Sequence, residues 1–138
     1  MITQTQTTSF QKELYEGIHD LLTDTIKIAL YTANADLGAD TTVYTTTEEV
    51  TGTGYVAGGN TLTGASVNSN DGVAFVSFSN TSWASASFTC RGALIYNSSK
   101  ANRSIAVLNF GADKIVSNQT FTVTFPANTA TCAIIRSV

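Results

Sequence analysis

Charged residues, proline, cysteine and histidine are all scarce in this sequence. Charged side chains make up 12% of its 138 residues, against an ordinary share of about 25%. The few lysines and arginines are scattered and form no basic stripe of the kind that binds phosphates. Because the formal net charge is also negative, at −3, we expect no binding to nucleic acid.

Long apolar runs are absent as well. No stretch approaches the roughly 20 apolar residues of a membrane span, and the chain does not open with the charged and apolar regions of a secretory signal. We therefore expect synthesis in a cytosol and no membrane contact. Cys90 and Cys132 lie in strand-like segments, which favours reduced thiols that serve as small apolar residues over a disulfide between them.

The shortage of reactive groups argues against catalysis. His19 is the only histidine, and we expect it on a solvated helix face beside Asp20, where it completes no Ser-His-Asp or Cys-His arrangement. One histidine and two distant cysteines do not supply closely spaced zinc ligands. Asp36 and Asp40 lack the spacing of a calcium loop. The sequence thus predicts a protein that is not an enzyme, with no catalytic, cofactor-binding or metal-binding residues.

A pair of adjacent glutamates and a glycine-containing stretch could suggest a glycosidase site and a phosphate-binding loop, but neither has the required pattern. Glu48 and Glu49 are adjacent, and neighbours on an extended chain point to opposite faces, unlike the facing carboxylates of a glycosidase. The stretch at 52–59 contains several glycines but is not followed by the lysine of a phosphate-binding loop. We expect this stretch to be a flexible surface loop.

The aromatic residues allow two interpretations. Aromatic faces can stack on sugars, but small β-domains bury most of their aromatic side chains. For Trp83, packing in the core or an interface is therefore favoured over ligand binding. The tyrosines that would form a sugar platform with it are Tyr31, Tyr44 and Tyr55. The phenylalanines expected in the core are Phe75, Phe78, Phe88, Phe110, Phe121 and Phe125.

The first part of the chain predicts an arm and a helix. Residues 1–8 are rich in Thr and Gln and have one apolar side chain after Met1, so we expect a flexible arm that becomes ordered against a partner. From Phe10 onward, apolar residues recur at helical spacing, which predicts one amphipathic helix over about residues 9–22. Gly17 weakens this helix by roughly 1 kcal/mol relative to alanine.

The rest of the chain predicts strands and turns. Apolar runs bounded by turn residues indicate strands, at 26–31, 62–67, 73–78, 86–90, 93–96, 105–110, 121–125 and 132–136. Residues 70–72, Asn-Asp-Gly, are typical of a tight hairpin, and a second turn is expected at 111–114. Residues 32–60 are expected to form a long, mobile loop with one or two short strands that contacts a partner.

This succession of strands predicts the fold class. About seven to nine short strands without βαβ alternation indicate a mainly β fold. We expect an antiparallel β-sandwich, with a jelly roll as one version of it, and one N-terminal amphipathic helix. A chain of this length fits a single domain, which we place at 9–138 after the arm at 1–8.

Five segments resemble a family of small virion proteins of tailed bacteriophages. They are RGALIYN at 91–97, AVLNFGADK at 106–114, FTVTFP at 121–126, IKIALYT at 26–32 and EVTGTGY at 49–55. Together the resemblance extends over roughly residues 9–137. It implies a late structural protein of a phage particle, made in the host cytoplasm and located in the virion. The family contributes no catalytic residues.

Within a virion, the favoured role is capsid decoration. A cement protein that binds only the assembled head stabilises that head by linkage. Its expected partners are the major capsid protein or other virion proteins, and we expect a homo-oligomer. Two alternatives remain: a tail or neck component, including a receptor-binding tip, and a carbohydrate-binding module. The sequence leaves open whether Trp83 and the 32–60 segment bind a glycan or another protein.

Overall fold

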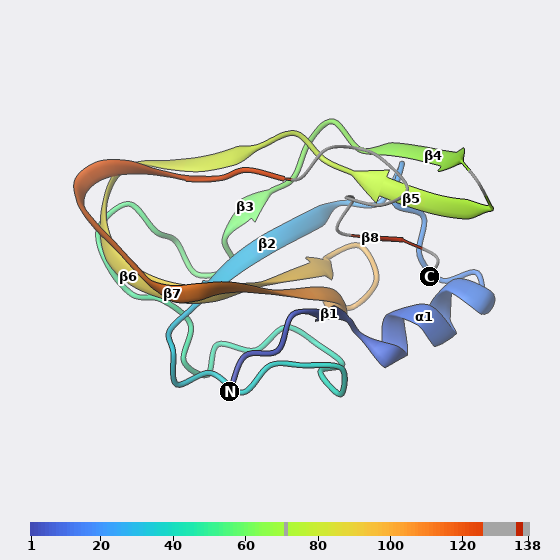
Figure 1. The fold of residues 1–138 in the computed structure, drawn as a ribbon, viewed down its shortest axis with the longest axis horizontal. Coiled ribbons are helices and arrows are strands. Elements are labelled where there is room, and N and C mark those ends of the chain that lie inside the picture. The colour runs from blue at the N-terminus through green and yellow to red at the C-terminus, as the bar shows by residue number, and fades with distance from the viewer. Residues whose placement is uncertain (71, 126–134, 137–138) are drawn as a thin grey trace.

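The structure, a computed structural model, describes residues 1–70, 72–125 and 135–136. Strands make up 51% of these residues and helix 6%, so the protein is mainly β, as the sequence predicts. Every pair of neighbouring strands in its two sheets is antiparallel. Figure 1 shows the strands in two layers, with the short helix beside one end of them.

The larger sheet has five strands in the order β1-β7-β6-β2-β3. These strands are β1 (Thr5–Gln6), β7 (Arg103–Val123), β6 (Thr81–Asn97), β2 (Ile26–Tyr31) and β3 (Asn60–Thr61). The smaller sheet has the order β4-β5-β8. It consists of β4 (Ser66–Asn70), β5 (Val73–Ser77) and β8 (Ile135–Arg136).

β6 and β7 are far longer than the sequence predicts. The expected strands at 86–90 and 93–96 are parts of one strand, β6, and those at 105–110 and 121–125 contribute to one strand, β7, which ends at Val123. β6 and β7 pair along their length. Figure 1 shows that this two-stranded ribbon turns back on itself, so that its two halves lie in different layers.

The corner of the ribbon lies where a turn was expected at 111–114. Cys90 pairs with Lys114 and Gly92 with Asn109, so β7 carries extra residues opposite Arg91. An insertion of this kind is a β-bulge, which bends a strand and increases its twist without ending the pairing. The glycine and polar residues of this segment therefore produce a corner within a strand instead of a turn between strands.

The main hydrophobic core lies on one face of the larger sheet. β2 contributes Ile26, Ile28 and Leu30, and Phe78, Trp83 and Phe88 join them. Burying a side chain of this size is worth about 1.5–3 kcal/mol, so this cluster supplies much of the stability. Phe75, Phe78 and Phe88 are buried as predicted, whereas Phe110, Phe121 and Phe125 are only partly buried and pack against the cluster.

A second cluster lies on the opposite face of the same sheet. Ala29, Tyr31, Leu94 and Val107 pack there with Ile2, Ala35 and Leu37. The middle of β2 is therefore covered on both faces. This explains the continuous apolar runs of β2 and β6, which are typical of strands buried on two sides.

The segment 32–60 provides much of this second cover. It carries Ala35 and Leu37 in the second cluster, and Val50 and Tyr55 in the main core. Isolated bridges join Thr53 to Ser87 and Glu49 to Tyr31. The expected mobile loop is instead packed on the sheet, because its few apolar residues are placed at the points where it crosses the strands.

The helix, α1 (Thr8–Tyr15), is shorter than the predicted 9–22. It begins at the N-cap Thr7, whose side chain accepts a hydrogen bond from the Phe10 N–H. It ends at Tyr15, with Glu16 as the C-cap, and the next residue, Gly17, has a φ of +74°. The Ile18 N–H bonds to the Glu13 carbonyl and the Gly17 N–H to the Leu14 carbonyl, the pattern of a Schellman cap.

Residues 1–8 also differ from the expected flexible arm. Ile2 is buried against Leu37 and its neighbours, and β1 adds an edge strand beside Ala106 and Val107 of β7. Gly92 leaves the space that Ile2 fills, since a Cβ at that position would lie 2.8 Å from the Ile2 side chain. One well-placed isoleucine and a few backbone hydrogen bonds are thus enough to hold this polar segment.

The hairpin expected at 70–72 is present. Asn70 of β4 pairs with Val73 of β5, which leaves a two-residue connection, and Gly72 has a φ of +78°. Cys90 is a free, buried thiol within β6, as expected, and burial raises its pKa to about 12. Cys132 and most of the strand predicted at 132–136 lie outside the described residues.

Two glycines with nearly equal backbone angles allow a matched stability test. Gly59 has a φ of +77°, and a Cβ there would lie 1.8 Å from the Ile28 carbonyl oxygen, whereas Gly72 has a φ of +78° and open space around it. Gly72→Ala should lower the free energy of unfolding by about 1–2 kcal/mol through backbone strain alone. Gly59→Ala should lower it by about 3 kcal/mol or more, because β2 must also move. Equal losses in urea denaturation would contradict the close approach of residues 52–60 to β2.

Candidate functional site

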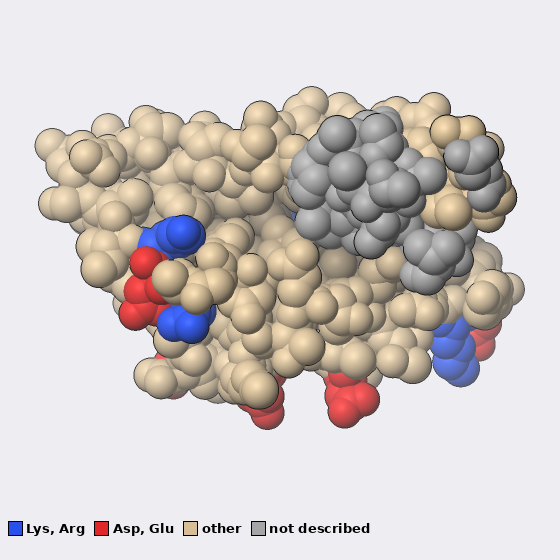
Figure 2. Space-filling model, viewed as in Figure 1, with Lys and Arg blue, Asp and Glu red and all other residues tan. Residues whose placement is uncertain are grey.

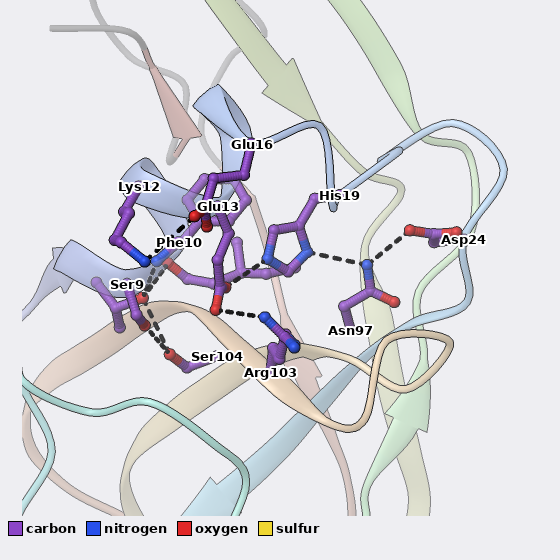
Figure 3. Close-up of polar contacts among 12 residues, drawn as sticks. Ser9, Phe10, Lys12, Glu13, Glu16, His19, Asp24, Asn97, Arg103 and Ser104 are labelled. Atoms are coloured by element: carbon purple, nitrogen blue, oxygen red, sulfur yellow. Dashed lines mark hydrogen bonds and ion pairs between the residues drawn. The ribbon is translucent and has the colours of Figure 1, made fainter.

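A cluster of polar side chains lies under α1 and joins it to the loop between β6 and β7 (Figure 3). We call it the helix-anchor cluster and define it by Glu13, His19, Asp24, Asn97 and Arg103. Its members come from segments far apart in the sequence. It contains the only histidine of the chain, which makes it the first place to look for chemistry.

His19 follows α1 and is not part of it, so the predicted place on a solvated helix face is wrong. Its side chain is 0% exposed, and its ring packs at 5.1 Å from the Phe10 ring. The Nε2 atom lies 2.9 Å from Glu13 Oε1, and Nδ1 lies 3.0 Å from Asn97 Nδ2. Since Glu13 accepts and the amide nitrogen donates, this network fits the neutral ring with its proton on Nε2.

Asn97 fixes that arrangement. Its Nδ2 also donates to Asp24 Oδ2 at 2.8 Å, and its Oδ1 accepts the Ser99 N–H at 3.0 Å. Rotating the amide by half a turn would place its acceptor against the Asp24 carboxylate and its donors against the Ser99 N–H. Asn97 is fully buried, so such mispaired groups would be costly.

Asp24 gains its electrostatic stabilisation here. Burial by itself would raise the pKa of Asp24, but hydrogen bonds from Asn97, from the Asp20 N–H and from Lys100 outweigh it and lower the pKa to about 2. Lys100 Nζ lies 2.9 Å from Asp24 Oδ1. On the other side of the cluster, Arg103 Nη1 lies 2.9 Å from Glu13 Oε2. The two ion pairs fix both ends of the cluster.

Hydroxyl groups near the start of α1 form a second, smaller network. The Ser104 hydroxyl donates to the Thr41 carbonyl at 2.7 Å and lies 3.0 Å from the Thr7 hydroxyl. Ser9 lies 3.3 Å from Ser104. These contacts join α1, β7 and the segment 32–60 at one point.

The geometry does not present His19 as a general base for a nucleophile. Both ring nitrogens are occupied by Glu13 and Asn97, and the serine hydroxyls of the smaller network bond to one another and to carbonyl oxygens. A base must reach the proton that it removes, and here the ring has no free nitrogen. The helix-anchor cluster therefore holds elements together.

A second buried polar group centres on Glu49. Its carboxylate accepts hydrogen bonds from the Tyr44 hydroxyl at 2.6 Å, from the Gly58 N–H at 2.8 Å and from the Tyr55 hydroxyl. Burial and the hydrogen bond to Glu49 raise the pKa of Tyr55 above its usual range. The Tyr96 ring stacks on Tyr44 with centroids 4.7 Å apart. This group fastens the segment 32–60 to the sheet.

The residues considered as a sugar platform lie within this packing. Tyr31, Tyr55 and Trp83 are buried, and only Tyr44 is partly exposed. The ring centroids of Trp83 and Tyr55 are 6.1 Å apart. Trp83 is thus a core residue, as favoured by the sequence. Its buried indole N–H has no hydrogen-bond partner in the described part of the chain.

The remaining acidic candidates are not brought together. Asp36 is 99% exposed near the N-terminal amine, and the Glu48 carboxylate accepts a hydrogen bond from the Thr32 hydroxyl. Within residues 1–70, 72–125 and 135–136, no group of three or more His, Cys, Asp or Glu side chains is placed to hold a metal ion. The stretch 52–59 is mostly exposed, as expected for a surface loop, but Gly52 and Gly54 lie close against β6 and Gly59 against β2.

An apolar groove lies between α1 and the smaller sheet. Its cavity volume is about 520 Å³, and its lining includes Phe10, Leu14, Leu21, Phe75 and Ile135. Leu14 and the nearby Leu22 and Val67 are exposed along it. Apolar grooves of this size can accept an apolar side chain or a small ligand, and none of the sequence patterns predicted one here.

No family model, no curated protein and no solved structure matches this chain. The resemblance to phage virion proteins therefore depends on the five sequence segments alone. The structure places segments 26–32, 91–97 and 106–114 mainly in β2, β6 and β7. Among the described residues, no helix is long and apolar enough to cross a membrane.

Sequence reasoning missed both buried polar groups. Glu13 and His19 are six positions apart, and side chains at that spacing do not meet on a regular helix or along an extended strand. Their contact depends on the reversal of the chain after Gly17. The Glu49 group is drawn from β6 and from well-separated positions in 32–60, and no local pattern links them. The one available signal was the pair of acidic residues amid tyrosines at 44–55.

The low pKa of Asp24 predicts a defined loss of stability in acid. Because its pKa in the folded protein is about 2, below the ordinary 3.8, the carboxylate adds stability that is fully present above about pH 4 and lost as the pH falls toward 2. Asp24→Asn should therefore lower the free energy of unfolding at pH 7 and change it much less at pH 2. Urea denaturation at both pH values measures this difference.

Asp36→Asn is the matched control, because the Asp36 side chain is 99% exposed. It should change stability by less than about 0.5 kcal/mol at either pH. If Asp24→Asn destabilised the protein as much at pH 2 as at pH 7, the hydrogen-bonded carboxylate would not be the source of its effect.

Proposed function

We propose that this chain is a non-enzymatic structural protein of a tailed-bacteriophage particle, and that it acts as a capsid decoration protein on the assembled head. In this proposal its two layers form an antiparallel β-sandwich, for which a jelly roll is one description. Its partner is the major capsid protein. The protein is made in the host cytoplasm and resides in the virion.

The observation that carries the proposal is the character of the surface. Figure 2 shows a face that is mostly uncharged, with the lysine, arginine, aspartate and glutamate side chains gathered toward its left and lower rim. The exposed residues of β7 beyond its corner include Ser117, Thr120 and Thr122. A neutral surface rich in hydroxyl and amide groups suits a broad hydrogen-bonded contact with another protein.

The internal use of the polar groups supports the same proposal. His19 and Glu49, which an enzyme would present to a substrate, bond to neighbouring side chains inside the molecule. They hold α1 and the segment 32–60 in place. A cement protein must remain folded on a shell under internal pressure, and such cross-links between distant segments favour that rigidity.

The tail and carbohydrate alternatives make different predictions. A tail or neck component, including a receptor-binding tip, is present in few copies at one vertex. A carbohydrate-binding module binds glycans as an isolated domain and normally does so through exposed aromatic faces. Burial of Tyr31, Tyr55 and Trp83 counts against the carbohydrate alternative, and copy number separates decoration from a tail component.

Quantitative mass spectrometry of purified particles tests the proposal. We expect this chain at a copy number comparable with that of the major capsid protein, and we expect gold-labelled antibody on the head surface. Purified protein should also rebind to heads stripped of it and raise the temperature at which they release DNA. A few copies per particle, with label at the tail, would instead identify a tail component.

A further inference from the structure

The outer edge of β7 is open along its second half. β1 covers that edge only at Ala106 and Val107, and side chains from the N-terminal segment reach Asn109. In the part of the chain that the structure describes, no strand pairs with this edge from Gly111 to Val123. Alternate residues of such an edge leave their N–H and C=O groups free to pair with another strand.

This edge lacks most of the features that normally prevent an exposed edge strand from pairing with a strand of another molecule. Proteins protect exposed edges with charged residues, prolines or bulges, yet residues 115–123 contain no charged residue and no proline. The nearest charges are Lys114 and Asp113, at the corner, and Asp113 is paired with Arg91 at 3.5 Å. A bulge at Asn118, where φ is +51°, separates the corner from residues 119–123.

The inner face of the same segment is incompletely covered. Phe121 packs against Trp83, Phe88 and Phe110 with ring centroids 5.6–6.0 Å apart, yet it is only partly buried. Its neighbours Thr120 and Thr122 are exposed. A strand with the same alternation, apolar inward and threonine outward, would complete the cover of Phe121 and leave the threonines in solvent.

We infer that a second copy of this chain binds this edge, with residues 119–123 of the two copies pairing antiparallel about a two-fold axis near Phe121. The second copy supplies the required alternation by symmetry, which makes the contact self-complementary. Phe121 then lies opposite Phe121 of the other copy, and Thr120 opposite Thr122. Cross-strand aromatic pairs of this kind stabilise antiparallel sheets.

The charges permit this arrangement. With the axis at Phe121, the two Lys114 residues are separated by fourteen positions, or roughly 45 Å along the paired strands. That distance exceeds the Debye length of about 10 Å, so the copies do not repel one another there. The pairing is short, and we expect a dimer with a dissociation constant in the micromolar range.

Sedimentation velocity over a concentration series tests the inference. The unmodified chain should shift from monomer to dimer at micromolar concentrations. A double variant with Thr120→Lys and Thr122→Lys should remain monomeric, because like charges meet across the axis. A second double variant, with Thr120→Glu and Thr122→Glu, should also be monomeric. An equimolar mixture of the two should recover the dimer, which no defect of folding would produce.

Thr89→Lys is the matched control. Thr89 is exposed on β6, one strand in from the edge, and this variant should dimerise like the unmodified chain. Amide hydrogen exchange adds a readout that needs no substitution: protection at 119–123 should rise with protein concentration. A chain that stays monomeric throughout, or a dimer whose protection at 119–123 does not change, would overturn the inference. The outcome is independent of whether the protein decorates a head.

Discussion

The pairing of β6 with β7 positions the other parts of the described structure. The paired strands β6 and β7 run through both layers of the fold. Their bend at the Cys90–Gly92 bulge determines where the second layer lies. β2 pairs with the second half of β6, and β1 pairs with the first half of β7. The main core then forms between the two halves of the ribbon.

Buried polar groups fasten the remaining segments to this ribbon. Glu49 holds the segment 32–60 through two tyrosine hydroxyls and a backbone N–H, and His19 joins the end of α1 to Asn97 at the end of β6. A buried polar group that loses a partner costs about 1–3 kcal/mol. Each network therefore strongly favours one arrangement of its segment, which is consistent with the structural role proposed above.

The sequence predicted the features that depend on neighbouring residues. The hairpin at 70–72 follows from Asn-Asp-Gly chemistry, and the burial of Phe75 and Phe88 follows from local apolar patterns. Prediction from the sequence failed for features that depend on contacts between distant parts of the chain. The end of α1 depends on how Gly17 turns the chain toward Asn97, and the continuity of β7 depends on its pairing with β6 through the corner. To predict that Ile2 and the segment 32–60 cover the sheet, one would need to know that the sheet has a second apolar face.

Residue-resolved amide hydrogen exchange on the free protein tests most directly the claim that one bent ribbon organises the fold. The account predicts that the paired amides of β6 and β7 on both sides of the corner, such as those of Phe88 and Leu94, exchange only through global unfolding and with one common free energy of opening. It also predicts fast exchange in the monomer for the outward amides of 119–123. Two clearly different opening free energies on the two sides of Gly92 would show that the halves fold as separate units and would contradict the account.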